Sequence, residues 1–242
     1  YILLGLLCFA NSRSLRRAYL YSALIFTTLM LVVSEVLSLF HALALRPLAL
    51  VWAGIIIILG GMVYWKRALL SAALSEKRTK RLKFSAREKA AFTVGIIILV
   101  LTFLGSTLYP PVSSDALEIY SLRTFMWQQN ASNAFFPTYA YAMLFSSTLV
   151  DNIIVQINIL SNSEVFGSLI QWFSLLGCGV VSSLIAQSLG CRKKGQIIAA
   201  LAALSMPLAV LQSTGPKHDL TTAFFASALV FFIVRIVRNA KG

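Results

Sequence analysis

Long apolar runs alternate with short polar segments along most of the chain. The runs cover about residues 1–10, 18–39, 47–65, 90–108, 165–189, 196–212 and 220–234. A helix that crosses a membrane needs about 20 mostly apolar residues, because the hydrocarbon core is about 30 Å thick. The pattern therefore predicts an all-α fold, a polytopic bundle of about seven transmembrane helices. The first run is short and looks like the tail of a truncated span.

The composition also indicates a membrane protein. Apolar residues make up 58% of the 242 residues, above the roughly 45–50% of soluble domains, and the mean hydropathy is +0.81. The chain starts inside an apolar run without an initiator Met and stops just after the last run. We therefore expect an N-terminal fragment of a longer protein, which could be inactive alone.

Charged residues are sorted along the chain in a way that predicts its orientation. Short loops rich in Lys and Arg stay in the cytoplasm. Placing residues 11–17, 66–89, 192–194 and 235–241 inside accounts for 18 of the 21 basic residues, and six of the eight acidic residues then fall at or near the outer side. The net charge of +13 is therefore mostly a topology signal, and nucleic acid is not expected as a partner.

Residues 131–162 do not fit a single span. The preceding span ends outside, and the next must start outside to reach its basic inner flank, so the segment cannot cross an odd number of times. Its apolar stretches are short and interrupted by polar residues. We expect helices lying along the membrane in a large outer loop at 109–164, in preference to a complete transmembrane hairpin.

The polar segment 110–130 follows the fourth long run and holds the first candidate functional residues. Asp115 is a candidate general base, but Asp115 with Glu118 three residues later also resembles a capping box at a helix start. Arg123 could pair with Glu118 or with Asp151, or bind a phosphate or lipid headgroup.

The turn at 213–219 holds the second group, on the same outer face. Asp219 precedes an apolar run and could be a helix N-cap, while Lys217 beside a helix N-terminus could hold a phosphate. His218 is more typical of a neutral interfacial polar group than of a ligand. Glu35, near the outer end of its span, is expected to snorkel or to pair with Arg46.

Five stretches follow one another between residues 109 and 232: SSDALEIYSLRTFMWQQN after a span, FPTYA, LSNS leading to QWF, SLIAQSLGCRKKGQ, and LQSTGPKHDL opening a helix. In this order and spacing they resemble the integral-membrane glycosyltransferases of the GT-C superfamily. The resemblance is to bacterial relatives of protein O-mannosyltransferases and of the aminoarabinose transferase acting on lipid A. It divides the chain into residues 1–90, with N-terminal spans and a basic cytoplasmic loop, and residues 91–242, an incomplete catalytic module.

The resemblance implies transfer of a sugar from a polyprenyl-phosphate donor to an acceptor hydroxyl at the outer face of the membrane. Asp115 takes the position of the catalytic base, and Asp219 that of a second acid. Substrate-binding roles then fall to Glu118, Arg123, Lys217 and His218. Because only some members use the second acid to hold a divalent cation, neither a metal site nor another cofactor is predicted, although a divalent cation is possible.

The expected partners are the lipid-linked donor, membrane lipids, and a protein, lipid or glycan acceptor. The expected location is the plasma membrane of a bacterium, with the active site on the extracytoplasmic side. Two other functions fit a membrane protein with outer acidic residues. A transporter or lipid flippase would carry charges near the middle of the bilayer. A scaffold subunit of an envelope complex would use Asp115 and Asp219 only as helix caps.

Overall fold

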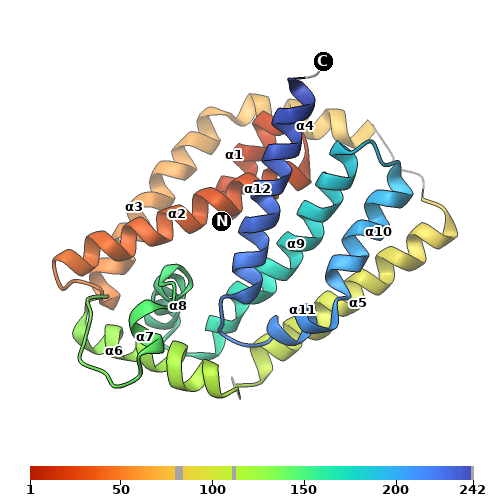
Figure 1. The fold of residues 1–242 in the computed structure, drawn as a ribbon. Helices are drawn as coiled ribbons and strands as arrows, with labels where there is room; N and C mark the ends of the chain where they lie inside the picture. Colours follow the sequence, from red (N-terminus) through yellow and green to blue (C-terminus); the bar gives the residue numbers. More distant parts are fainter. Residues whose placement is uncertain (80–83, 111–112, 241–242) are drawn as a thin grey trace.

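The computed structural model describes residues 1–79, 84–110 and 113–240, and these residues form helices and connecting loops without a β-strand. The α-helices are α1 (Ile2–Ser12), α2 (Leu15–Leu39), α3 (Leu45–Trp65), α4 (Arg67–Thr79), α5 (Ala86–Leu108), α6 (Leu122–Asn130), α7 (Ala142–Phe145), α8 (Leu149–Ser161), α9 (Leu169–Ser188), α10 (Lys193–Leu204), α11 (Pro207–Gln212) and α12 (Asp219–Asn239). A π-helical turn η1 (Ala116–Ser121) precedes α6, and a 3₁₀ turn η2 (Val165–Ser168) precedes α9 (Figure 1). The predicted all-α class is confirmed.

Five of the seven expected spans are helices long and apolar enough to cross a membrane. They are α2, α3, α5, α9 with its η2 turn, and α12. Most of their surface is apolar and much of it is exposed, as expected for side chains that face lipid.

α1 has 11 residues, too few to cross a membrane by itself, which agrees with the short first run of the sequence. The structure differs from the expected spans at the sixth. The run at 196–212 is divided between α10 and α11, because Pro207 lacks a backbone N–H and cannot continue the preceding helix. Pro207 instead occupies the first turn of α11, where a missing N–H costs nothing.

Helix α9 lies at the centre of the bundle and packs against α2, α5, α10 and α12. A buried cluster joins Leu20 on α2, Val181 and Leu184 on α9, and Phe231 on α12. Gly177 lets α12 approach α9 closely, since a Cβ atom there would lie 2.5 Å from the Phe224 ring. Small residues at such contacts allow membrane helices to pack backbone to backbone.

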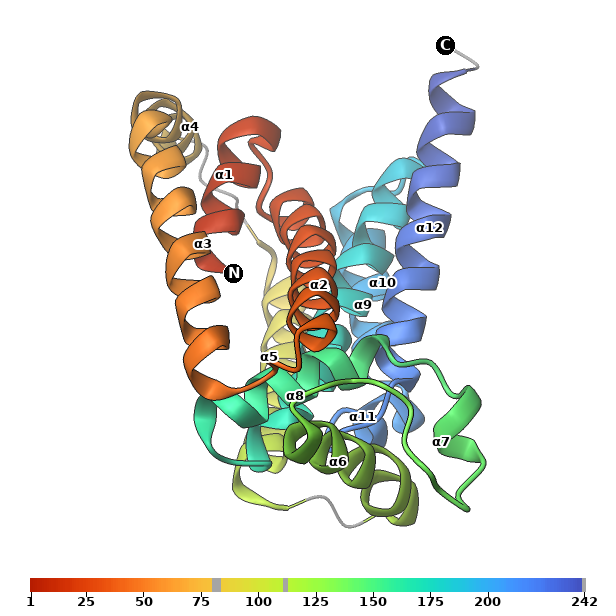
Figure 2. The ribbon, with the colours of Figure 1, turned by 90° about the vertical axis from the view of Figure 1, so that its left-hand side faces the viewer.

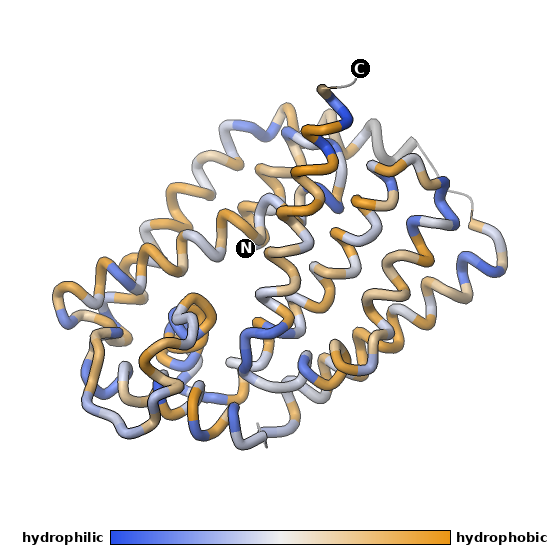
Figure 3. The backbone as a smooth tube through the Cα atoms, viewed as in Figure 1, coloured by the Kyte–Doolittle hydropathy of each residue, from blue (hydrophilic) through white to orange (hydrophobic). Residues whose placement is uncertain are grey.

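The two ends of the bundle carry opposite charge. One end is here called the basic end. There, Arg16 at the start of α2 donates a hydrogen bond to the Gln196 side chain at the start of α10, and Arg238 near the end of α12 donates to the Ser188 carbonyl on α9. The opposite end, here called the acidic end, holds the starts of η1 and α12 together with α6, α7 and α8 (Figures 1 and 2). Apolar positions dominate the helices between them (Figure 3).

Helix α8 runs crosswise to the long helices at the acidic end (Figures 1 and 2). Its 13 residues are too few to span a membrane, which agrees with the expectation of non-spanning helices in the segment 131–162. Neighbouring helices cover it more completely than the sequence led us to expect. Gln156, fully buried, donates to Ser34 on α2 and accepts from the Trp52 indole on α3.

Candidate functional site

The segment that begins with Asp115 meets the turn at 213–219 at the acidic end. The Lys217 ammonium lies 3.2 Å from an Asp115 carboxylate oxygen, although the two residues are 102 positions apart. Asp115 remains 62% exposed, whereas Lys217 is 16% exposed. The ion pair therefore leaves most of the carboxylate open to solvent.

A second contact between the same two segments joins Tyr120 and His218. Their rings meet edge to face with centroids 4.3 Å apart, and the Tyr120 hydroxyl lies 3.4 Å from His218 Nδ1. Tyr120 is carried by the π-helical turn η1, which widens the helix directly after Asp115. Such turns are rare and frequently occur at functional sites.

Burial and nearby charges shift the pKa values of both rings. Burial raises the pKa of Tyr120 to about 12, and the charges of Asp219, Asp151 and Asp115 contribute to the rise. Burial also lowers the pKa of His218, a shift that the Asp219 charge opposes and the Arg123 charge reinforces. At neutral pH the phenol is therefore protonated and the imidazole is neutral, so each can donate or accept a hydrogen bond.

Two long helices hold the turn at 213–219 in place. Ser106 on α5 donates to the Ser213 carbonyl at 2.9 Å, and Gln171 on α9 accepts from the Leu220 backbone N–H at 3.1 Å. Two buried nitrogens here, His218 Nε2 and Gln171 Nε2, have no hydrogen-bond partner. Buried polar atoms without partners are uncommon and carry a free-energy cost.

Neither candidate carboxylate serves as a helix cap. Asp115 has helical backbone angles and makes no side-chain cap hydrogen bond, so the expected capping box with Glu118 is not formed. Asp219 is the first residue of α12 and directly follows the N-cap residue His218, and its side chain is exposed. Its charge can still interact favourably with the helix N-terminus. The capping interpretation of both residues is therefore not supported.

Arg123 forms one of the pairings left open by the sequence, the one with Asp151. The two side chains are 1% and 0% exposed, with the atoms Nη1 and Oδ2 2.7 Å apart. Arg123 also donates to the Ser146 hydroxyl in the segment after α7. Burial raises the pKa of the Asp151 carboxyl, and the neighbouring guanidinium opposes that rise. Arg123 thus joins α6 to α8.

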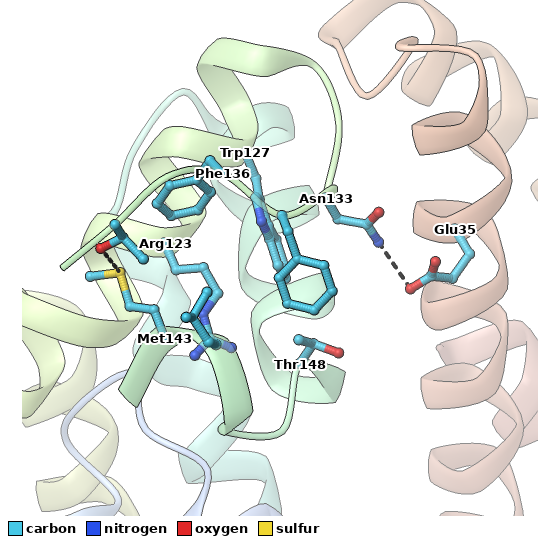
Figure 4. Close-up of a pocket in the computed structure, with 10 residues that line it drawn as sticks. Glu35, Arg123, Trp127, Asn133, Phe136, Met143 and Thr148 are labelled. Atoms are coloured by element: carbon cyan, nitrogen blue, oxygen red, sulfur yellow. Dashed lines mark hydrogen bonds between the residues drawn. The ribbon is translucent and has the colours of Figure 1, made fainter. Parts of the chain in front are cut away.

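A cavity of about 180 Å³ opens beside Arg123. It is lined by Arg123 and Trp127 from α6, by Glu35 from α2, and by Phe136 and other residues of the loop that follows α6 (Figure 4). Glu35 accepts hydrogen bonds from the side-chain amides of Asn133 and Asn152, at 2.9 and 3.4 Å. The expected pairing of Glu35 with Arg46 is not formed in the described part of the chain.

The six residues predicted for the site fall into three groups. Asp115, Lys217, His218 and Asp219 come together, and Arg123 lies behind them within the protein. Glu118 is exposed on η1, and the structure gives it no hydrogen bond or ion pair within the described ranges. Sequence reasoning missed Tyr120. The available signal was its spacing of five residues from Asp115, which one π-helical turn brings to the same side.

Within residues 1–79, 84–110 and 113–240, no group of three or more His, Cys, Asp or Glu side chains is placed to hold a metal ion. No family model, curated protein or solved structure matches the chain. Function must therefore be argued from the site itself.

Proposed function

We propose that the protein is a membrane glycosyltransferase that moves a sugar from a polyprenyl-phosphate donor to an acceptor hydroxyl. The observation that supports this most strongly is the exposed Asp115 carboxylate beside the Lys217 ammonium at the acidic end of the bundle. A carboxylate can take the proton of the acceptor, and an ammonium can bind the phosphate of the donor.

In the proposed reaction the acceptor oxygen attacks the anomeric carbon of the donor sugar as Asp115 takes its proton. The bond between that carbon and the phosphate oxygen breaks, and its electron pair leaves with the lipid phosphate. Lys217 stabilises the negative charge on this leaving group. Asp115 is largely exposed, and ion pairs at a protein surface contribute only about 0–1 kcal/mol, so Lys217 can exchange Asp115 for phosphate at little cost.

Tyr120, His218 and Asp219 have supporting roles in this proposal. The protonated Tyr120 and the neutral His218 contact each other at 3.4 Å beside the Asp115–Lys217 pair, and both can donate hydrogen bonds to sugar hydroxyls. Asp219 can accept a hydrogen bond from the sugar. Glu118 keeps its predicted substrate-binding role only if the acceptor lies across the exposed face of η1.

The distribution of charge favours this function over transport. Every charged residue of α2, α3, α5, α9 and α12 lies in the first or last two turns of its helix. A transporter usually places ionisable groups near the middle of the membrane, on broken helices. Chemistry at one membrane surface needs no such groups.

We also propose two spans in addition to the five long helices. α10 and α11 together cross once, with a break at Pro207, and α1 belongs to a further span, which makes seven in all. The basic end then faces the cytoplasm and the acidic end the outside of the plasma membrane of a bacterium. The acceptor is a protein, lipid or glycan on that side.

A transfer assay tests the proposal. Membrane vesicles containing the protein receive polyprenyl phosphate carrying a radiolabelled hexose, and label reaching lipid or protein is counted. Asp115→Asn keeps the size of the side chain but removes the base, so transfer should fall about 10²–10⁴-fold. Lys217→Gln should raise the donor concentration needed for half-maximal rate more than it lowers the maximal rate.

Glu164→Gln is the matched control, because Glu164 is also an exposed acid at the acidic end but lies at the start of η2. It should leave transfer unchanged. Transfer by Asp115→Asn at the rate of the unmodified protein would overturn the proposal. Movement of labelled donor across the membrane without cleavage would favour the transporter instead.

A further inference from the structure

An apolar groove runs between α5, α9 and α10, away from the site at the acidic end. Its volume is about 440 Å³, within the roughly 300–1,000 Å³ of ligand-binding pockets. Aliphatic side chains such as Leu99, Val180 and Leu201 form its walls. Nothing in the proposed glycosyl transfer uses this groove.

Two glycines shape the groove. Gly95 on α5 and Gly179 on α9 both line it, and a Cβ atom on Gly95 would come within 3.5 Å of Leu204 across the groove. A Cβ atom on Gly179 would lie 2.9 Å from Leu204, so α9 and α10 pack closely there, and the groove lies in the space between these two helices and α5. A larger side chain at Gly95 would project into that space.

The mouth of the groove is polar and lies at the basic end. Arg16, Ser183, Gln196 and Lys193 line it. The Arg16 guanidinium donates to the Ser183 hydroxyl at 3.1 Å and to the Gln196 and Gln187 side-chain carbonyls at 3.0 Å each. These partners are all neutral, so they orient the guanidinium without cancelling its charge.

Glu88, the acid of α5 at this end, caps its own helix. Glu88 accepts a hydrogen bond from the Ser85 backbone N–H at 2.7 Å and completes the capping box of α5. Its charge acts on both Lys193 and Lys194, but it does not line the groove. The groove therefore combines a long apolar interior with a cationic mouth.

We propose that this groove binds one phospholipid with an anionic headgroup, taken from the leaflet next to the basic end. An acyl chain fills the space between α5 and α10, and the phosphate lies against Arg16 and Lys193. Basic pockets between membrane helices on the cytoplasmic side bind anionic lipid headgroups in this way. The occupant is argued from charge complementarity and from the position of the mouth at the membrane surface.

The test is lipid titration of the purified, delipidated chain, followed by native mass spectrometry. The probes are phosphatidylglycerol and phosphatidylcholine with identical acyl chains. One phosphatidylglycerol should bind more tightly than phosphatidylcholine. Lys193→Gln should weaken phosphatidylglycerol binding about fivefold, the value of roughly one charge near a membrane surface, without affecting phosphatidylcholine. The control Lys194→Gln, one residue outside the groove, should have no such effect.

A second pair of variants tests the apolar part. Gly95→Leu fills the groove and should abolish binding of both lipids, whereas Gly54→Leu, at a position on α3 with open space around it, should not. Thermal unfolding shows whether each variant is folded. If Gly95→Leu does not fold, the result for Lys193→Gln decides whether the groove binds the lipid. Equal affinity for the two lipids, equal effects of Lys193→Gln and Lys194→Gln, or displacement of lipid by inorganic phosphate alone would overturn the proposal.

Discussion

At the scale of single residues, the buried pair of Arg123 and Asp151 has the largest energetic consequence. Both side chains are almost completely buried, so neither charge is stabilised by water. Removing one partner of such a pair leaves the other charge uncompensated in a medium of low dielectric constant. The pair therefore holds α6 against α8 and keeps the cavity beside Arg123 in shape.

Asp151→Asn should lower the free energy of unfolding by about 3–5 kcal/mol. The double variant Arg123→Met with Asp151→Leu should be much closer to the unmodified protein, because it removes both charges together. Unfolding in detergent, followed by tryptophan fluorescence, measures both. A double variant as unstable as Asp151→Asn would show that the pair is not the cause.

His218 predicts a pH dependence of stability. Its pKa is lower in the folded protein than the ordinary value of 6.5, so below that value the unfolded chain binds more protons than the folded one. Its contribution is fully present above pH 6.5 and is lost as the pH falls through that value. Lowering the pH from about 7.5 to about 5.5 should therefore lower the unfolding temperature more in the unmodified protein than in His218→Gln. The control His41→Gln should behave like the unmodified protein.

At the scale of helices, close packing between α9 and α12 depends on Gly177. A methyl group there would lie 2.5 Å from the Phe224 ring, which is buried and cannot move aside freely. Gly177→Ala should lower the free energy of unfolding by about 1–3 kcal/mol through overpacking. Gly54→Ala, a matched change in a helix with open space around it, should be neutral or slightly stabilising. Thermal unfolding should show a loss of stability for Gly177→Ala and none for Gly54→Ala, and equal losses for the two variants would contradict this explanation.

Helices were predicted from the sequence wherever length and hydropathy decide the structure. The five long spans follow from apolar runs near 20 residues. The division at Pro207 was missed although its signal was present, because apolar content was weighed above the missing N–H. The burial of α8 could not be predicted, since it depends on side-chain matches such as Gln156 with Trp52, which lie 104 positions apart. The alternation of spans predicted that Asp115 and the turn at 213–219 lie at the same end, but the contact between Asp115 and Lys217 depends on how the helices pack and could not be predicted.

For the whole molecule, the separation of charge between the two ends is the basis of the proposed orientation. Cys191 is exposed at the basic end and serves as a native reporter. An impermeant maleimide should label it only after the membrane is permeabilised. Ser114→Cys, at an exposed position of the acidic end, should be labelled in intact cells when Cys191 is replaced by Ser. Labelling of Cys191 in intact cells would reverse the proposed orientation.

In the proposed function, the segment beginning with Asp115 and the turn at 213–219 together bind a lipid-linked sugar. Photocrosslinking with a polyprenyl-phosphate hexose that carries a photoreactive group on the sugar tests it most directly, because it does not depend on turnover. We expect crosslinks within residues 113–121 and 213–221. Lys217→Gln should reduce their yield, and so should an excess of unlabelled donor. Crosslinks confined to the groove at the basic end, or unaffected by unlabelled donor, would contradict it.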